Sequence, residues 1–254
     1  MNDDQLLRYS RHLLLKEVDL AGQERLARAR VLVVGCGGLG AAAVPYLAAA
    51  GVGELWLADD DAVELSNLQR QVAYGEADLG RPKVDAARDA VRRIDPAVKL
   101  RTFAERLDEA RLVALAREVD VLLDCSDNYP TRQALNRAAL AARRPVVVGA
   151  AVRFDGQLLV VDPRRAGTPC YHCLFGGSEA SDGACATFGV FSPLVGVIGA
   201  QQALEALKLI IGIGDAPIGR LISYDALSGA WRELGFGRDP ECASCAPYAR
   251  MDQP

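Results

Sequence analysis

Histidine is scarce in this sequence, which has only His12 and His172 among 254 residues. Neither follows a predicted strand in the first half of the chain, where the proton shuttle of a dehydrogenase would be expected. There is also no G-x-S-x-G motif, so the sequence does not support a hydrolase with a Ser-His-Asp triad. The chemistry must therefore come from other side chains.

The sequence also lacks an excess of positive charge. It has 29 lysines and arginines against 33 aspartates and glutamates, for a net charge of −4 and a pI near 5.3. Proteins that bind nucleic acid over a broad surface are usually basic. We therefore expect no nucleic-acid partner.

The N-terminal segment lacks the features of a secretory signal, because two aspartates precede its apolar residues and its longest apolar run is short. Two uncharged stretches, 31–53 and 186–204, are interrupted by glycine and proline, as in buried elements of an α/β fold. We expect a cytoplasmic protein with no membrane partner. The seven cysteines are then free, metal-bound or reactive, and do not form a disulfide framework.

Strands and helices are predicted to alternate over the first 150 residues. Apolar runs at 31–35, 54–59, 98–103, 120–127 and 145–150 are predicted strands, with helices at 39–50, 83–95, 111–119 and 132–143 between them. This order is typical of an α/β fold with a Rossmann-like parallel sheet. Residues 1–29 are predicted to be helical. A strand at 157–162, a long helix at 193–212 and a hairpin at 220–234 then continue the parallel sheet as a mixed one, within a single domain of residues 1–254.

The segment 35–40, "GCGGLG", has the G-x-G-x-x-G pattern directly after a predicted strand and at the start of a helix. Glycines there let backbone N–H groups approach a phosphate at the positive end of the helix dipole. Asp59, about twenty residues on, is placed to bind a ribose hydroxyl. The pattern predicts nucleotide binding without naming the nucleotide; the alternative is a glycine-rich turn that binds nothing.

The segment that follows Asp59 is unusual for a dehydrogenase. It runs "DDDAVELSNLQRQ" and is followed by "LGRPK", which gathers Arg70, Lys83 and several amides downstream of the nucleotide acid. Such groups suit a triphosphate, whose negative charge must be neutralised during phosphoryl chemistry. The alternative is a surface loop with incidental charges.

Asp127 and Asn128 follow the predicted strand 120–127. In open α/β sheets the carboxyl ends of the strands face the ligand. Asp127 is therefore a candidate to hold Mg²⁺ or to position the nucleotide. The alternative is that these residues cap the next helix, because Asp and Asn often begin helices.

Two C-x-x-C pairs, Cys170/Cys173 and Cys242/Cys245, lie far apart in the sequence. Four thiolates in two such pairs are typical of a structural zinc site, which would attach the C-terminal region to the irregular segment after residue 162. A redox pair is the alternative. The segment after Cys173 contains Cys185, a candidate nucleophile in a Gly/Ser-rich context, although a cysteine of this kind is more often inert.

Taken together, these motifs resemble the MoeB/ThiF/HesA family of adenylyltransferases, bacterial relatives of the ubiquitin-activating enzymes. The resemblance spans about residues 8–245 and rests on "RYSRHLLL", "VLVVGCGGLG", "LADDDAVELSNLQRQ", "RPKVDAARDAVRRIDP", "LLDCSDN", "CYHC", "GVIGAQQALEALKLI" and "CASC". The stretches "VGAAVRFDGQ" and "SYDALSGAWREL" look closest to the MoeB branch of that family.

The resemblance implies an enzyme that uses ATP and Mg²⁺ to adenylylate the C-terminal glycine of a ubiquitin-like sulfur carrier. It gives an acyl-adenylate and pyrophosphate. For the MoeB branch the carrier is the MoaD-like small subunit of molybdopterin synthase, in molybdenum cofactor biosynthesis. A carrier ending in Gly-Gly, a separate sulfur donor, a homodimer and a carrier-binding, zinc-containing half at 151–254 are further implications.

The resemblance also assigns roles to residues. Asp59 would hold the ribose and Asp127 the Mg²⁺, while Arg11 would reach the partner's site across the dimer interface. The implied nucleotide-binding set is Gly38, Asp59, Ser66, Asn67, Leu68, Gln69, Arg70, Lys83, Asp127 and Asn128, and within it Asn67, Arg70 and Lys83 would contact the phosphates. Cys185 matches a cysteine that some relatives use for sulfur or carrier transfer, but its context "ACATFG" departs from their pattern.

Three alternatives follow from these observations. The first is the same activation of a ThiS-like carrier for thiamine thiazole or another thiocarboxylate pathway. The second is a binding module that holds a nucleotide without chemistry, against which Arg11, Asn67, Arg70, Lys83 and Asp127 argue. The third is an NAD-dependent oxidoreductase, which would bind NAD and show no dependence on ATP.

Overall fold

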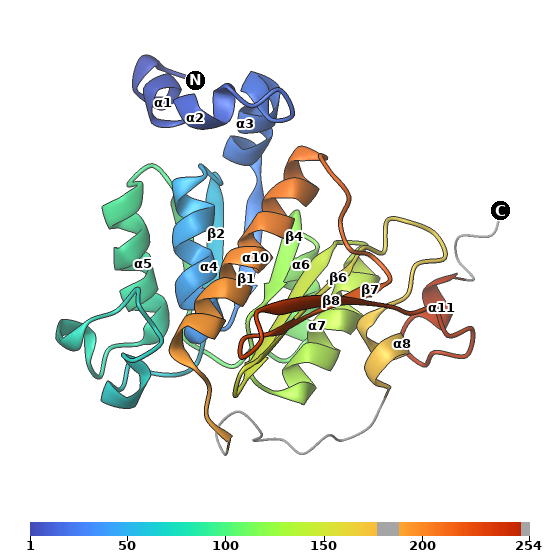
Figure 1. Cartoon of the computed structure of the whole chain (residues 1–254). Coiled ribbons are helices and arrows are strands. Elements are labelled where there is room, and N and C mark those ends of the chain that lie inside the picture. The colour runs from blue at the N-terminus through green and yellow to red at the C-terminus, as the bar shows by residue number, and fades with distance from the viewer. Residues whose placement is uncertain (177–187, 250–254) are drawn as a thin grey trace.

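A single eight-stranded sheet runs through the protein in the computed structural model, which describes residues 1–176 and 188–249 (Figure 1). The strand order is β3-β2-β1-β4-β5-β6-β7-β8. The strands are β1 (Arg30–Val34), β2 (Glu54–Ala58), β3 (Lys99–Phe103), β4 (Val121–Asp124), β5 (Val146–Val152), β6 (Asp155–Val161), β7 (Arg220–Asp225) and β8 (Ala230–Gly235).

The first five strands are parallel and the last three are added antiparallel, which confirms a Rossmann-like sheet that continues as a mixed one. Strands β1, β2 and β4 are almost wholly buried and consist mainly of apolar residues, as expected for strands covered on both faces. Strand β5 is longer than predicted and pairs with β6 as a hairpin that turns at Arg153 and Phe154.

Helices connect the strands and cover both faces of the sheet. They are α1 (Asp3–Arg8), α2 (Ser10–Leu13), α3 (Asp19–Arg28), α4 (Gly38–Ala49), α5 (Lys83–Ile94), α6 (Glu109–Ala116), α7 (Tyr129–Ala142), α8 (Tyr171–Phe175), α10 (Ser192–Ile211) and α11 (Ala246–Ala249). Two short 3-10 helices, η1 (Leu65–Asn67) and η2 (Glu76–Asp78), lie between β2 and α5.

Two hydrophobic cores lie on opposite faces of the sheet. Helices α4, α5 and α10 pack on one face, on side chains such as Val31, Val33 and Leu55. Helices α6 and α7 pack on the other face, on Leu32 and Trp56. The alternation of strand side chains between the two cores follows from the period-2 geometry of a strand.

Helix α10 is long and apolar enough to pass a length-and-composition test for a membrane span, the only described helix that does so. Half of its most apolar window is nevertheless buried, and the helix lies across the sheet against α4, β5 and β6 (Figure 1). Its apolar character is thus explained by its place in the core.

The N-terminal helices lie at the end of the sheet where β1 begins (Figure 1). The Tyr9 hydroxyl donates to the Asp95 carboxylate at 2.7 Å, just after α5 ends, and Gln23 donates to the Ala50 carbonyl, just after α4 ends. Desolvation and the Asp95 hydrogen bond raise the pKa of Tyr9 to about 12. These contacts hold α1–α3 at the amino-terminal edge of the strands.

Helix α7 begins at Tyr129, three residues before its predicted start. The Asn128 side chain accepts a hydrogen bond from the Thr131 N–H at 3.0 Å, and Pro130 occupies the first turn, where its missing N–H costs nothing. The helix-cap alternative considered for Asn128 is therefore correct for its side-chain oxygen.

The close packing of α10 on α4 leads to a stability prediction. A Cβ at Gly199 would lie 2.4 Å from the Leu39 carbonyl oxygen, whereas a Cβ at Gly196 on the same helix would meet no atom within 4 Å. Gly199→Ala should lower the free energy of unfolding by about 1–3 kcal/mol through overpacking. Gly196→Ala, the matched control, should leave it unchanged or raise it by up to about 1 kcal/mol, measured by urea denaturation. Equal effects of the two substitutions would contradict this account of the helix contact.

Candidate active site

A cavity of about 370 Å³ opens at the carboxyl ends of the parallel strands. From β1 the chain proceeds outward through β2 to β3 and then crosses back to β4 on the other side of β1. The loops after β1 and β4 therefore diverge, and such a switch point is where open α/β sheets bind ligands. The cavity volume suits a small-molecule ligand.

The glycine loop closes one side of this cavity. Gly35 has a φ of +96°, and a Cβ there would lie 2.5 Å from the Cys125 carbonyl oxygen. A Cβ on Gly40 would lie 2.1 Å from the Gly35 carbonyl oxygen, so a side chain at either position would separate helix from strand. The loop leads into Gly38, the first residue of α4, whose free N–H groups point the positive end of the helix dipole at the cavity.

Asp59 follows β2 and is held by the glycine loop. Its carboxylate accepts hydrogen bonds from the Cys36 N–H at 2.6 Å and from the Asp61 N–H at 2.9 Å. Burial raises the pKa of Asp59, and the nearby Lys83 ammonium opposes that rise. The two backbone bonds fix the carboxylate at the cavity wall, in the position predicted for a ribose contact.

Lys83 is the first residue of α5 and is almost completely buried at the cavity. Its ammonium group pairs with the Asp61 carboxylate at 2.6 Å, and its N–H donates to the Asp61 carbonyl at 2.9 Å. The Asp61 carboxylate is mostly exposed, so the pair lies at the cavity mouth. An anionic ligand entering there would meet the ammonium and compete with Asp61 for it.

The segment around η1 supplies an amide and a guanidinium to the same cavity. Asn67 is buried, and its side-chain oxygen accepts a hydrogen bond from the Glu64 N–H at 3.3 Å. Arg70 donates to the Ser66 carbonyl at 3.0 Å, which holds its guanidinium along the cavity wall. Asn67 and Lys83 are both buried. The alternative of a surface loop with incidental charges is therefore wrong for these two residues.

Asp127 and Asn128 lie between β4 and α7 and face the glycine loop across the cavity. The Asp127 side chain is exposed, as a carboxylate must be to take a hydrated cation from solvent. Arg132, one turn into α7, donates to the Ser126 carbonyl at 2.9 Å and so braces the loop that carries Asp127.

The cavity therefore collects most of the residues that the sequence predicted for the nucleotide. Those that line it are Gly38, Asp59, Asn67, Gln69, Arg70, Lys83, Asp127 and Asn128. Ser66 and Leu68 do not line it: the Ser66 hydroxyl donates to Glu64, and Leu68 packs against the core. Arg11 is exposed on α2 at the opposite end of the sheet, and Cys185 lies outside the described residues.

Several cavity residues were missed by the sequence reasoning. They are Asp60, Asp61, Gln71, Arg106 and Arg132. A signal for two of them was present, because Arg106 follows the end of β3 and Arg132 lies four residues after the capping Asn128. Gln71 lies in the amide-rich segment noted in the sequence but was not predicted as a site residue. It is buried beneath Gly37, and its side-chain oxygen has no hydrogen-bond partner within the described residues.

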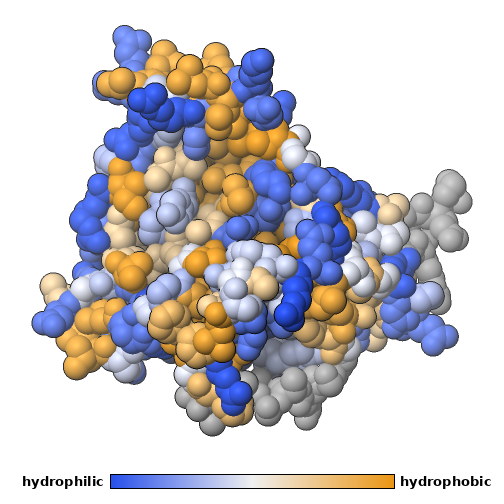
Figure 2. Space-filling view, viewed as in Figure 1, coloured by the Kyte–Doolittle hydropathy of each residue, from blue (hydrophilic) through white to orange (hydrophobic). Residues whose placement is uncertain are grey.

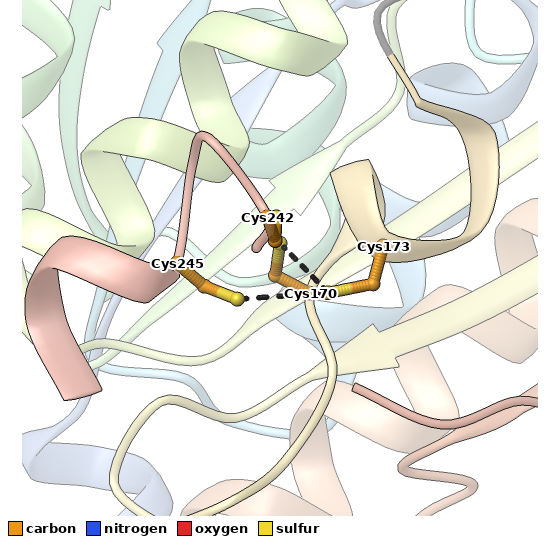
Figure 3. Close-up of side chains that lie close together, drawn as sticks. All are labelled: Cys170, Cys173, Cys242 and Cys245. Atoms are coloured by element: carbon orange, nitrogen blue, oxygen red, sulfur yellow. Dashed lines mark hydrogen bonds between the residues drawn. The ribbon is translucent and has the colours of Figure 1, made fainter. Parts of the chain in front are cut away.

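The two C-x-x-C pairs come together beside α7, and none of the four cysteines lines the cavity. Figure 3 shows the four sulfurs pointing toward one another from α8 and from the segment before α11. All lie within 4.8 Å of one another, with Sγ–Sγ distances of 3.8 Å (Cys170–Cys173), 3.7 Å (Cys170–Cys242) and 3.5 Å (Cys173–Cys245). Zn–S bonds of about 2.3 Å in a tetrahedron place sulfurs about 3.8 Å apart, so the four residues fit a structural zinc ion.

The surroundings of the cluster act on the thiols in both directions, because burial disfavours the thiolate form and hydrogen-bond donors favour it. Burial raises the pKa of the Cys170 thiol well above its usual range and that of Cys245 to about 11, so a metal must displace protons from both. Asn136 donates to the Cys170 sulfur at 3.6 Å, and the Arg238 side chain hydrogen-bonds Cys245. His172 faces away from this cluster and lies 3.2 Å from the Gln133 side-chain oxygen, as expected for a residue that is not a ligand.

The cysteine geometry predicts the metal content of the protein. The purified protein should carry about one zinc per chain, and Cys242→Ser should lose most of it and unfold at a lower temperature. Cys125→Ala, which removes a buried thiol outside the cluster, should retain zinc. Because the raised thiol pKa values oppose metal binding, zinc affinity should fall as the pH is lowered. Metal analysis by mass spectrometry and a zinc-competition titration measure both, and zinc retention in Cys242→Ser would contradict the assignment.

Comparison with known proteins agrees with the fold and the site. Residues 9–244 match the ThiF family. The chain is 46% identical to the molybdopterin-synthase adenylyltransferase of Escherichia coli K12, over 96% of this chain and 98% of that protein, and 43% identical to the ThiS sulfur-carrier adenylyltransferase of the same organism, over 96% and 97%. Its fold superposes on the crystal structure of E. coli MccB with ATP with a TM-score of 0.80 at 25% identity, over 94% and 73% of the two chains. With a cavity at the sheet's switch point and a four-cysteine cluster, this chain belongs to the ThiF family and is an adenylyltransferase.

Proposed function

We propose that this protein activates the C-terminal glycine of a ubiquitin-like sulfur carrier by adenylylation, using ATP. The observation that carries the proposal is the cavity itself, about 370 Å³ in volume, which is lined by a helix N-terminus, Asp59, Arg70 and Lys83. The products are an acyl-adenylate and pyrophosphate. Names of relatives that match over nearly their whole length support the same reaction class.

The charge of the cavity indicates what else the reaction needs. Five carboxylates line it against four cationic side chains: Asp59, Asp60, Asp61, Glu105 and Asp127 against Arg70, Lys83, Arg106 and Arg132. A triphosphate and an attacking carboxylate are both anionic, so the site of one protomer is short of positive charge. We infer that Mg²⁺ and a further arginine from outside the protomer complete it.

Each residue then has a task in the reaction. The carrier carboxylate attacks the α-phosphorus of ATP, the bond from that phosphorus to the bridging oxygen breaks, and pyrophosphate leaves. Asp59 holds the ribose, while Arg70 and Lys83 offset charge on the phosphates and keep the reacting atoms in line. Asp127 would hold Mg²⁺, which supplies further neutralisation of the leaving group.

The carrier we propose is a MoaD-like small subunit of molybdopterin synthase, in molybdenum cofactor biosynthesis. The relative named for molybdopterin synthase is slightly more identical to this chain than the one named for ThiS. Activation of a ThiS-like carrier is therefore the alternative that an experiment must separate. A separate sulfur-donor protein would then deliver, in the cytoplasm, the sulfur that attacks the acyl carbon and releases AMP, which gives the thiocarboxylate.

We propose that the missing arginine is Arg11 of a second copy of the chain. Arg11 lies on α2, at the end of the sheet opposite the cavity, and cannot serve its own site. Leu7 and Leu14 on the same N-terminal segment are 76% and 73% exposed. Figure 2 shows apolar surface at the top, over the N-terminal helices. Leu65 and Val72, which flank the cavity segment, are 68% and 75% exposed. A two-fold dimer that covers both apolar regions would bring Arg11 to the partner's cavity.

Carrier-dependent ATP–pyrophosphate exchange tests the proposed reaction. Exchange should require Mg²⁺ and a carrier that ends in Gly-Gly, and a MoaD-like carrier should stimulate it more than a ThiS-like one. A carrier that lacks its last glycine is the control, since it offers no correctly placed carboxylate. Stronger stimulation by ThiS-like carriers would show that the carrier belongs to the thiamine thiazole pathway and not to molybdenum cofactor biosynthesis. NAD binding without exchange would overturn the adenylylation proposal.

Complementation between two inactive variants tests the shared site. Arg11→Ala and Lys83→Ala should each lose exchange activity by more than about 100-fold, because each removes charge stabilisation from the transition state. Co-expressed with different tags, they should recover about a quarter of wild-type activity, since half of the dimers hold one complete site.

The matched control for this experiment pairs Arg70→Ala with Lys83→Ala. Both substitutions lie in the cavity of their own chain, so every site in a mixed dimer contains one defect. No recovery is expected from that pair. Recovery from it, or none from the pair with Arg11→Ala, would show that Arg11 does not act across the interface.

A further inference from the structure

Helix α7 contacts both the nucleotide cavity and the four-cysteine cluster. Its cap, Asn128, and its first turn, through Thr131 and Arg132, line the cavity. Its later turns reach residues 170–176, the segment that supplies two of the four thiols. With 14 residues, α7 is about 21 Å long and rigid enough to connect the two sites.

Asn136 makes the connection at the metal end. It is 1% exposed, and its side-chain oxygen accepts a hydrogen bond from the Tyr171 N–H at 3.0 Å. Its side-chain nitrogen donates to the Cys170 sulfur at 3.6 Å. The oxygen and the nitrogen of this buried amide therefore both bond to the cysteine segment. Side chains that hydrogen-bond metal ligands in this way orient those ligands.

Gln133 continues the connection one turn nearer the cavity. This buried side chain donates to the Gly176 carbonyl at 3.0 Å and to the Tyr129 hydroxyl at 2.6 Å. The Tyr129 hydroxyl in turn donates to the Gly176 carbonyl. The first two turns of α7 are thus attached to the end of the cysteine segment.

Arg132 completes the connection at the cavity. It donates to the Ser126 carbonyl at 2.9 Å, and it interacts with the Tyr171 hydroxyl, which lies between the ligands Cys170 and Cys173 in sequence. Ser126 donates through its hydroxyl to the buried Asp124 carboxylate at 2.6 Å. The backbone that places Asp127 is therefore braced by a side chain that also contacts the cysteine segment.

We propose that α7 couples the two sites, so that bound zinc and bound nucleotide each strengthen the binding of the other. Arg132 and Asn136 are the positioning residues of this coupling. With zinc bound, residues 170–176 are fixed and satisfy the polar side chains of α7. Without it, Asn136 and Gln133 lose fixed partners in a buried region, which is costly enough to shift the helix and the Ser126–Asn128 turn.

The proposal rests on nucleotide binding in the cavity and extends it by assigning the metal a second role besides stability. Coupling between two sites is reciprocal, so the effect can be read at the metal without any catalytic turnover. The factor by which zinc tightens nucleotide binding must equal the factor by which the nucleotide tightens zinc binding. If the nucleotide leaves the rate of zinc association unchanged, this whole factor appears as slower zinc release.

Zinc release from the holoenzyme to a chromogenic chelator tests the coupling. The release rate is followed with and without a non-hydrolysable ATP analogue and Mg²⁺, while calorimetry measures binding of the same analogue. In the wild type, the nucleotide should slow release by about 5-fold or more. Asn136→Ala should bind zinc, release it faster and lose most of the nucleotide effect.

Arg132→Met gives an independent measure, because it leaves in place Asn136, the side chain of α7 that contacts a cysteine sulfur. It should carry zinc at the wild-type stoichiometry but show less than half of the nucleotide effect. Arg137→Met is the matched control: this arginine lies on the same helix, pairs with Glu109 at 2.8 Å and does not line the cavity. It should behave as the wild type does.

The outcomes separate this proposal from the one on which it rests. If calorimetry shows no binding of the nucleotide, the proposed function fails first. If the nucleotide binds but leaves zinc release unchanged, or if Arg137→Met abolishes the effect as fully as Arg132→Met, the coupling through α7 is wrong. If Asn136→Ala does not fold, Arg132→Met and its control still decide between these results.

Discussion

The contact between the ends of β1 and β4 organises the active site. Gly35 leaves no room for a side chain against the Cys125 carbonyl, and Gly40 leaves none against Gly35 itself. These close approaches bring the start of α4, whose N–H groups face the cavity, to the turn that carries Asp127. A Cβ at either glycine would separate the groups that line the cavity, so the geometry of the cavity depends on backbone packing before any charge is considered.

Within that frame, the distribution of charge sets the requirements of the chemistry. Carboxylates outnumber cations around the cavity, and the buried Lys83 is already paired with Asp61. Such a site does not neutralise a triphosphate alone. The proposed metal and the proposed arginine from a second copy have the same physical origin, which is a deficit of positive charge at the point where two anions must meet. The four cysteines are separate from this chemistry, and α7 is the element that contacts both regions.

Much of this arrangement was predictable from the sequence because its signals are local. Glycine spacing after a strand indicates a nucleotide loop, and alternating apolar runs indicate parallel strands. The first five predicted strands agree with the structure to within a few residues. The start of α7 was predicted three residues late, because the capping role of Asn128 was considered only as an alternative to ligand binding. The burial of Lys83 and Asn67 carried no local signal, since both lie in a polar segment and are covered by residues distant in the sequence.

The sequence by itself determined the family, the nucleotide loop and the identity of the four cysteines, because each is written in residue types at fixed spacing. Only the tertiary structure decided which groups meet. It joined Asp61 to Lys83 and Arg132 to Ser126, and it placed Arg11 at the end of the sheet away from the cavity. It also placed Asn136 against Cys170, across 34 residues of sequence. Contacts of this kind depend on the order of strands in the sheet and on which face a helix covers, and those are properties of the whole fold.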